Sequence, residues 1–283
     1  MPKMTVIFCR CKRDCKTINQ TIVFFRYLTI AIISDCDNTL MPDAPSLLLK
    51  ENGFDPQEFW DKIDLLVKEK WDPPIAWMTE IVKLIQEGKI KQNTNAKLAE
   101  FGASLDLYPG ADTFIDDMNN SFDVDIEGYV VSSGIESLMK GTVLSKSFTD
   151  IFGGSLYEKD GVIAGIQSSI TFTEKTKFVF AINKGIAGQI REKPYDVNNF
   201  IPSEERRIPF ENMIYLGDGP SDIPCFSMIE KHGGACIAID SKDEWSKKWE
   251  YELRNRKMDS FKPDYTKGSE LRKKLEDVIG ELR

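Results

Sequence analysis

The chain has 283 residues, with 37 Lys and Arg against 45 Asp and Glu, a formal net charge of −8 and an isoelectric point near 5.0. This acidic balance excludes a broad nucleic-acid-binding face, because such a face neutralises phosphates with Lys and Arg. The length allows one large domain or a domain with an insertion. The single histidine, His232, excludes a His-rich zinc site and leaves few places for a histidine base.

We interpret residues 1–20 as an amino-terminal extension, with disorder as a hypothesis. Residues 21–33 are largely apolar, but this stretch is too short for a membrane span and continues into a predicted strand. No membrane association is therefore expected. The six cysteines match no disulfide framework or zinc pattern, which favours a reduced, cytoplasmic protein. They are Cys9, Cys11, Cys15, Cys36, Cys225 and Cys236.

Two carboxylates follow the first predicted strand. Residues 28–33 are short, apolar and rich in β-branched side chains, which is typical of a strand buried on both faces. Asp35 and Asp37 come directly after it, with Cys36 between them expected to pack behind the strand end. In an open parallel sheet, ligands bind at the carboxyl ends of the strands. The pair is therefore a candidate for chemistry.

A second acidic pair follows another apolar strand, predicted over residues 212–216. Asp218 and Asp222 lie in a tight turn before an expected helix start near Ile223. Four converging carboxylates would repel one another unless a hard cation lay among them, and oxygen ligands suit Mg²⁺. One acid could attack as a nucleophile while its neighbour moves protons. The structural alternative, a turn or helix cap, is most plausible for Asp222.

Four segments in order resemble the motifs of the haloacid dehalogenase-like (HAD) phosphohydrolases. Asp35–Thr39 resembles the DxDxT signature, Val130–Gly134 the second motif, a lysine within Thr173–Lys177 the third, and Gly217–Asp222 the fourth. One such match is only moderately specific, but four ordered matches over two thirds of the chain are not expected by chance. The resemblance implies an α/β fold with a Rossmann-like parallel sheet core, phosphoserine-phosphatase-like, with an inserted helical C1-type cap.

The resemblance also implies roles for individual residues. Asp35 would form an aspartyl-phosphate, and Asp37 would serve as the general acid and base. Asp35, the backbone carbonyl of Asp37, Asp218 and Asp222 would hold Mg²⁺, with Asp222 acting directly or through water.

A further set would bind the phosphoryl oxygens: Ser132, the amide of Ser133, and a lysine. Lys175 fits best because an apolar helical pattern begins just after it at Phe178, and Lys177 is the reserve choice. Thr39 and Gly134 are assigned supporting roles, with the Thr39 side chain expected to fix the turn by a bond to the backbone.

Residues 43–107 are predicted to form the helical cap, and residues 21–42 and 108–283 the core. Two apolar stripes at helical spacing, separated by Pro73–Pro74, favour a helix hairpin. They comprise Phe59, Ile63, Leu66 and Val67, and Ile75, Met78, Ile81, Val82 and Ile85. A cap that closes over the site favours a small phosphorylated metabolite as partner.

The remaining core elements follow from turn signals and periodicity. A helix is predicted to begin at residues 108–111 and to lead to a strand at 129–131. Residues 152–163 are predicted to form a hairpin turning at Asp160–Gly161, and residues 270–283 an amphipathic helix.

Alternative functions remain at this point. Asp37 and the acidic fourth motif argue against a dehalogenase, whereas a phosphomutase would retain the same residues. A noncatalytic binding module on this scaffold has little need for a nucleophile and an acid together. The acidic residue that phosphoserine phosphatases carry after the first motif is displaced or replaced near Asp43 and Ala44, so the substrate stays open. The sequence does not define the oligomeric state.

Overall fold

The structure, a computed structural model, describes residues 7–8, 25–26, 28–240 and 247–282. The described part contains a seven-stranded sheet in the order β6-β5-β4-β3-β7-β8-β9 and a separate pair of short strands, β1 and β2. All neighbouring strands in the large sheet pair in parallel except β5 and β6. The strands are β1 (Ile7–Phe8), β2 (Phe25–Arg26), β3 (Thr29–Ser34), β4 (Asp125–Ile135), β5 (Asp150–Lys159), β6 (Val162–Ser168), β7 (Met213–Gly217), β8 (Ala235–Ile239) and β9 (Ser260–Phe261).

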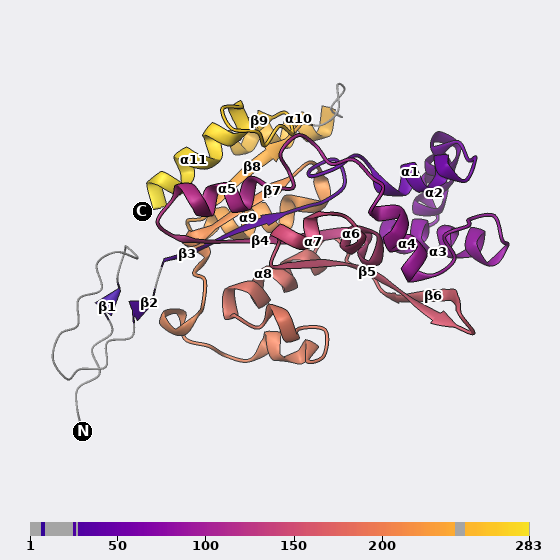
Figure 1. Cartoon of the computed structure of the whole chain (residues 1–283), viewed down its shortest axis with the longest axis horizontal. Helices are drawn as coiled ribbons and strands as arrows, with labels where there is room; N and C mark the ends of the chain where they lie inside the picture. Colours follow the sequence, from indigo (N-terminus) through magenta and orange to yellow (C-terminus); the bar gives the residue numbers. More distant parts are fainter. Residues whose placement is uncertain (1–6, 9–24, 27, 241–246, 283) are drawn as a thin grey trace.

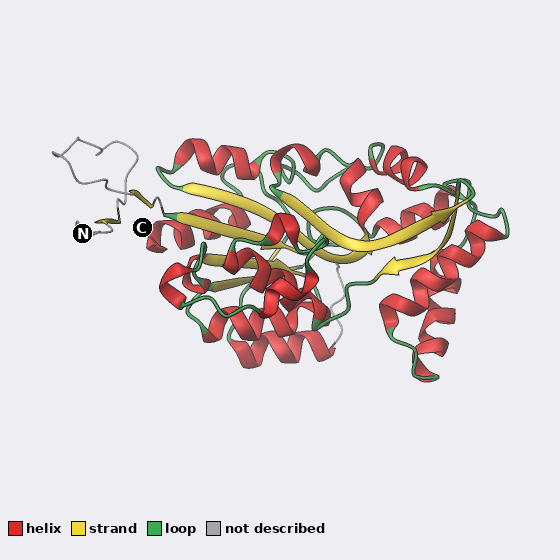
Figure 2. Cartoon of the chain, turned by 90° about the horizontal axis from the view of Figure 1, so that it is seen from below, coloured by secondary structure: helices red, strands yellow, loops and turns green. Residues whose placement is uncertain are grey.

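Helices cover both faces of this sheet (Figures 1 and 2). Buried side chains of α5 and α11 pack on one face, and those of α8 and α9 on the other. Among the helices that the structure describes, none combines the length and apolarity that a bilayer span requires. The helices are α1 (Ala44–Glu51), α2 (Pro56–Lys68), α3 (Pro73–Gln86), α4 (Asn95–Gly102), α5 (Phe114–Ser121), α6 (Glu136–Gly141), α7 (Leu144–Ser147), α8 (Glu174–Lys184), α9 (Ile223–Lys231), α10 (Lys247–Arg256) and α11 (Glu270–Leu282).

The predicted strand at residues 28–33 is confirmed as β3, the central strand of the sheet. Because side chains alternate between the faces of a strand, Ile30 and Ile32 pack in one core cluster, whereas Ala31 and Ile33 pack in the other. All four are fully buried. This double burial explains why the strand reads as a continuous apolar run.

The strand order reverses next to β3. The chain proceeds from β3 to β4 and β5 on one side, then returns to place β7 and β8 on the other side. The carboxyl ends of β3 and β7 therefore flank a topological switch point, where open α/β sheets bind ligands. Asp35 follows β3 and Asp218 follows β7, so both lie at this edge.

Between β3 and β4 lie the helices α1–α5, of which α1–α4 lie at one end of the sheet, beside the β5–β6 hairpin (Figure 1). Asp43, Asp55 and Asp72 cap the first three helices through their side chains, and each helix has Pro in its first two positions. The predicted apolar stripes are confirmed in α2 and α3, where Phe59, Ile63, Met78, Ile81, Val82 and Ile85 are buried.

The predicted hairpin is confirmed as β5 and β6, and it joins the sheet to the α1–α4 helices. Asp160 and Gly161 both have positive φ, at 54° and 79°, as a two-residue turn of this kind requires. The Gln86 side chain donates to the Ala164 carbonyl, and the Asn95 side chain donates to the Leu156 carbonyl, both at 2.9 Å. The hairpin is therefore attached to the helices by hydrogen bonds as well as by packing.

Of two further helices predicted in the core, one is confirmed and the other begins at a different residue. The amphipathic helix at residues 270–283 is confirmed as α11. The helix predicted to begin at residues 108–111 begins instead at Phe114. Gly110 has a φ of +74°, outside the right-handed helical region, and a Cβ there would lie 2.9 Å from the Tyr265 carbonyl carbon. Gly110 lies close to the backbone of Tyr265 in a conformation that is not helical, so the helix begins only after it, at Phe114.

Two glycines allow α4 and α6 to pack in close contact. A Cβ on Gly102 would lie 2.0 Å from the Leu138 carbonyl oxygen, and a Cβ on Gly141 would lie 2.0 Å from the Ala99 carbonyl oxygen. Both obstacles are backbone atoms, which cannot turn away as a flexible side chain could. The crossing joins α4 to the helix that follows β4.

We predict that Gly141→Ala destabilises the protein by about 1–3 kcal/mol, because the new methyl group overpacks a helix–helix contact. The matched control is Gly280→Ala in α11, where a Cβ meets no atom within 4 Å. Alanine's higher helix propensity should there increase the free energy of unfolding by up to about 1 kcal/mol. Urea unfolding of both variants measures the difference, and a stabilised Gly141→Ala variant would contradict the proposed packing.

Candidate active site

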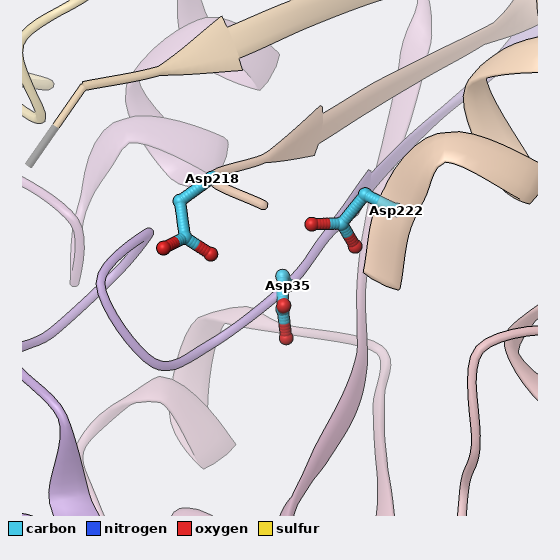
Figure 3. A group of neighbouring side chains, drawn as sticks. All are labelled: Asp35, Asp218 and Asp222. Carbon is cyan, nitrogen blue, oxygen red and sulfur yellow. The ribbon is translucent and has the colours of Figure 1, made fainter. Parts of the chain in front are cut away.

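Three carboxylates converge at the switch point. Carboxylate oxygens of Asp35, Asp218 and Asp222 all lie within 4.8 Å of one another. Figure 3 shows the three side chains near one another, with Asp35 coming from the end of β3 and the other two from the segment after β7. Asp222 is fully buried, Asp35 is 6% exposed, and Asp218 is partly buried.

A buried lysine neutralises part of this charge. Lys175, in the first turn of α8, is fully buried and its Nζ donates to Asp35 Oδ2 and Asp222 Oδ1, both at 2.7 Å. Lys175 Nζ also donates to Ser221 Oγ at 3.3 Å. Burial acts to lower the pKa of Lys175, but the carboxylates of Asp222 and Asp35 outweigh it and raise that pKa above its ordinary value. The ammonium therefore keeps its proton.

The reserve lysine lies elsewhere. Lys177 forms an ion pair with Glu174 on the surface of α8, and its Nζ lies 4.7 Å from the centre of the Phe178 ring. Its side chain is 29% exposed, whereas that of Lys175 is completely buried. Of the two lysines, only Lys175 contacts the carboxylates.

A tight turn presents Asp37 beside this group. Asn38 adopts a φ of +57°, a left-handed conformation that Asn tolerates, while Cys36 packs into the core as expected. Asp37 Oδ1 accepts the Ala44 amide at 2.8 Å. Burial, followed by the nearby charge of Asp43, raises the pKa of Asp37 well above its ordinary value, although the Ala44 hydrogen bond opposes this. This environment favours a protonated carboxyl group.

Thr39 does not fix this turn as predicted. Its hydroxyl is buried and has no hydrogen-bond partner among the described residues, so the expected bond from the side chain to the backbone is wrong. The turn is held instead by backbone bonds, including that from the Leu40 amide to the Cys36 carbonyl at 2.8 Å. The Thr39 carbonyl accepts the Tyr265 hydroxyl at 2.9 Å, which ties the turn to the carboxyl-terminal part of the chain.

The second motif lies within β4, which extends past the predicted strand at residues 129–131 to Ile135. The pairing with β5 shifts register between Val131 and Ile135, so Ser132, Ser133 and Gly134 occupy an irregular stretch of the strand. Ser132 Oγ accepts the Gly134 amide at 3.1 Å, and the Ser133 hydroxyl is buried without a partner among the described residues.

Gly134 brings this stretch against the first motif. A Cβ at position 134 would lie 2.8 Å from Asp37 Oδ2, so only glycine leaves the Asp37 carboxyl group undisturbed. The second motif and Asp37 are therefore in direct contact, although 97 positions separate Asp37 from Gly134 in the sequence.

Asp222 is held by several groups and does not cap α9 through its side chain. Its Oδ1 accepts the Tyr215 hydroxyl at 3.0 Å in addition to Lys175, and its Oδ2 accepts the Gly219 amide at 3.2 Å. Burial raises the pKa of Asp222 to about 6, although the Lys175 ammonium acts in the opposite direction.

Sequence reasoning missed Tyr215 and Ser221. The signal for Tyr215 was a hydroxyl in an otherwise apolar strand, two residues before Gly217 and therefore on the same face of β7. Ser221 lies one residue before Asp222 in the fourth motif, and only the tertiary structure shows that its hydroxyl lies within reach of Lys175.

The donor set fits Mg²⁺. Mg²⁺ takes oxygen ligands and usually binds through one or two carboxylates while keeping several waters. Asp35 and Asp218 supply such carboxylates within one small group, and Asp222 lies within the same distance. Both Asp222 oxygens accept hydrogen bonds, and so do both Asp35 oxygens, Oδ1 from the Cys36 amide and Oδ2 from Lys175, each at 2.7 Å, so hydrogen bonding does not separate direct from water-mediated contact at Asp222.

We predict that Lys175→Met lowers the free energy of unfolding by about 3–5 kcal/mol in EDTA, because it leaves Asp35 and Asp222 buried without their cation. Lys177→Met is the matched control on the same helix. Its partly exposed ion pair should contribute no more than about 1 kcal/mol. Equal losses for the two variants in urea unfolding would contradict the special position of Lys175.

Comparison with known protein families finds no family model that matches the chain. An uncharacterized protein of Borreliella burgdorferi (strain ATCC 35210 / DSM 4680 / CIP 102532 / B31) is 27% identical over 275 residues, which cover 86% of this chain and 93% of that protein. The similarity therefore extends over most of both chains.

Solved structures that resemble the protein give more information than this sequence relative does. A substrate-bound phosphoserine phosphatase is 20% identical, with a TM-score of 0.53 over 88% of this chain and 98% of that one. A HAD family hydrolase of Salmonella enterica subsp. enterica serovar Typhi is 18% identical, with a TM-score of 0.53 over 77% of this chain, and the chain spans 65% of that hydrolase. At these identities the likeness concerns the fold. The chain has the HAD-like α/β fold in its phosphoserine-phosphatase-like form, as the four motifs predict.

Proposed function

We propose that the protein is a Mg²⁺-dependent phosphatase that hydrolyses a small phosphomonoester through an aspartyl-phosphate. The observation that carries this proposal is the 2.7 Å contact between Lys175 Nζ and Asp35 Oδ2 inside a group of three carboxylates. A nucleophilic carboxylate, a fixed cation and a potential metal site thus occupy one small space. The phosphoserine phosphatases and the HAD hydrolase of similar fold support this reaction class.

In the proposed first step, a carboxylate oxygen of Asp35 attacks phosphorus. A bond forms between that oxygen and phosphorus, the ester P–O bond breaks, and the leaving oxygen takes the proton of Asp37. The raised pKa of Asp37 fits an acid that is protonated before the leaving group departs. In the second step, water attacks phosphorus, Asp37 takes a proton from that water, and Asp35 leaves as a free carboxylate.

The phosphoryl oxygens need positive charge and hydrogen-bond donors during both steps, because phosphoryl transfer is catalysed mainly by positioning and electrostatics. Lys175, the Ser132 hydroxyl and the Ser133 amide are the proposed donors of this chain. Asp35, Asp218 and the backbone carbonyl of Asp37 would hold Mg²⁺, with Asp222 contributing directly or through water. The bound ion would supply further positive charge opposite the phosphoryl oxygens.

The position of α1–α4 supports a small substrate. These helices lie between β3 and β4 in sequence, and the first of them begins just after the turn that carries Asp37. We infer that they act as a cap over the site, which would exclude water and polymeric substrates. A small phosphorylated metabolite is therefore the proposed partner. A phosphomutase and a noncatalytic binding module are the competing functions.

The test measures phosphate release from p-nitrophenyl phosphate, phosphoserine and a panel of phosphorylated metabolites, with Mg²⁺ or with EDTA. The wild type should release phosphate only with Mg²⁺. Asp35→Asn should lower kcat by at least about 1000-fold, because it removes the nucleophile. Asp37→Asn should lower kcat by about 100- to 10,000-fold, the usual contribution of a general acid.

Circular dichroism and unfolding of both variants provide the control, since each substitution keeps the size of the side chain. Full activity of Asp35→Asn would refute the mechanism. Transfer of phosphate between two positions of a substrate, without release, would favour a phosphomutase. A folded wild type that turns over none of these compounds would favour a binding module.

A further inference from the structure

The hydroxyl of Tyr215 is a buried polar group that the proposed reaction does not use. Tyr215 lies in the middle of β7 and is fully buried. Its Oη donates to Asp222 Oδ1 at 3.0 Å, and its ring packs edge-to-face on Phe226 with centroids 5.6 Å apart. A buried hydroxyl is costly unless it is bonded, so its bond to the Asp222 carboxylate is informative.

The alternation of β7 places this hydroxyl under the site. Positions 215 and 217 lie on the same face of the strand, and the turn that follows brings Asp222 back over that face. A Cβ on Gly217 would lie 2.4 Å from the Asp222 carboxyl carbon. The missing side chain at Gly217 therefore creates the space that Asp222 occupies, directly above Tyr215.

Three donors then fix the Asp222 carboxylate in this space. Tyr215 and Lys175 share Oδ1, whereas the Gly219 amide binds Oδ2. Rotation of the carboxylate would break bonds on both oxygens. Because Lys175 Nζ also contacts Asp35 Oδ2, the position of Asp222 determines where the ammonium lies relative to the nucleophile.

We propose that Tyr215 is a positioning residue of the active site, which orients Asp222 so that Lys175 is held against Asp35. This inference rests on the proposed function. Tyr215 is fully buried, and the proposed role is exerted through its bond to Asp222. Without its hydroxyl, the Asp222 carboxylate is held by two donors instead of three, Lys175 on Oδ1 and the Gly219 amide on Oδ2, so its position and that of Lys175 are fixed less closely.

The test uses Tyr215→Phe, which removes one oxygen atom and keeps the ring contact with Phe226. We expect kcat to fall about tenfold or more, since small displacements of catalytic groups have large effects on rate. KM should change less than about threefold, because the substrate-binding surface is retained. The Mg²⁺ concentration that gives half of the rise in melting temperature should increase severalfold.

Tyr129→Phe is the matched control. Tyr129 is also a buried tyrosine of the sheet, and its hydroxyl donates to a carboxylate, that of Glu127, at 2.6 Å. Loss of that bond should lower the melting temperature but change neither kcat nor the Mg²⁺ midpoint. In an Asp222→Asn background, Tyr215→Phe should have little further effect on the Mg²⁺ midpoint, because the partner through which it acts is gone.

The outcomes separate this inference from the proposed function. An active wild type with an unchanged kcat and Mg²⁺ midpoint in Tyr215→Phe would overturn the role of Tyr215 and leave the phosphatase intact. A wild type without phosphatase activity would refute the function, while the Mg²⁺-dependent melting of the same variants would still test the positioning. A wild type whose melting temperature does not respond to Mg²⁺ would refute the proposed ion site, and an unchanged kcat in Tyr215→Phe would then overturn the positioning.

Discussion

The arrangement of the site depends on the buried ion pairs that the Lys175 ammonium forms with Asp35 and Asp222. An isolated charge in a protein interior costs several kcal/mol, and so do carboxylates crowded together. In this protein each offsets the other, because Lys175 lies between Asp35 and Asp222 at 2.7 Å from both. The ammonium comes from α8, whereas the carboxylates come from the ends of β3 and β7. The ion pairs of Lys175 thus connect α8 with the ends of β3 and β7 around the candidate site.

The sheet topology makes this meeting possible, and small residues complete it. The reversal of strand order beside β3 brings the ends of β3 and β7 together, and the irregular stretch of β4 brings the second motif against Asp37. Glycine occurs where a side chain would collide with a carboxylate of the candidate site, at Gly134 against Asp37 and at Gly217 against Asp222. The site is therefore shaped by the absence of side chains as well as by their presence.

Much of this could be predicted from sequence, because β3 and β7 carry strong local signals and the motif spacing identifies the acids. Sequence left Lys175 and Lys177 open, since both lie near the start of one helix. Only tertiary structure shows that one is buried and the other pairs with Glu174 on the surface. The Thr39 prediction failed because local turn chemistry does not reveal that backbone bonds hold the turn. Tyr215 was missed because a tyrosine in a strand is usually a packing residue.

The proposed reaction depends on Asp35 as the nucleophile. The most direct measurement quenches the wild type with acid during turnover of its best substrate in Mg²⁺, reduces any acyl-phosphate with borohydride, and locates the modified residue by peptide mass spectrometry. If Asp35 is the nucleophile, the reduced residue is Asp35, and a quenched sample without substrate contains no reduced residue. An enzyme that turns over under the same conditions with no modified aspartate, or with the modification on Asp218, would contradict this role of Asp35.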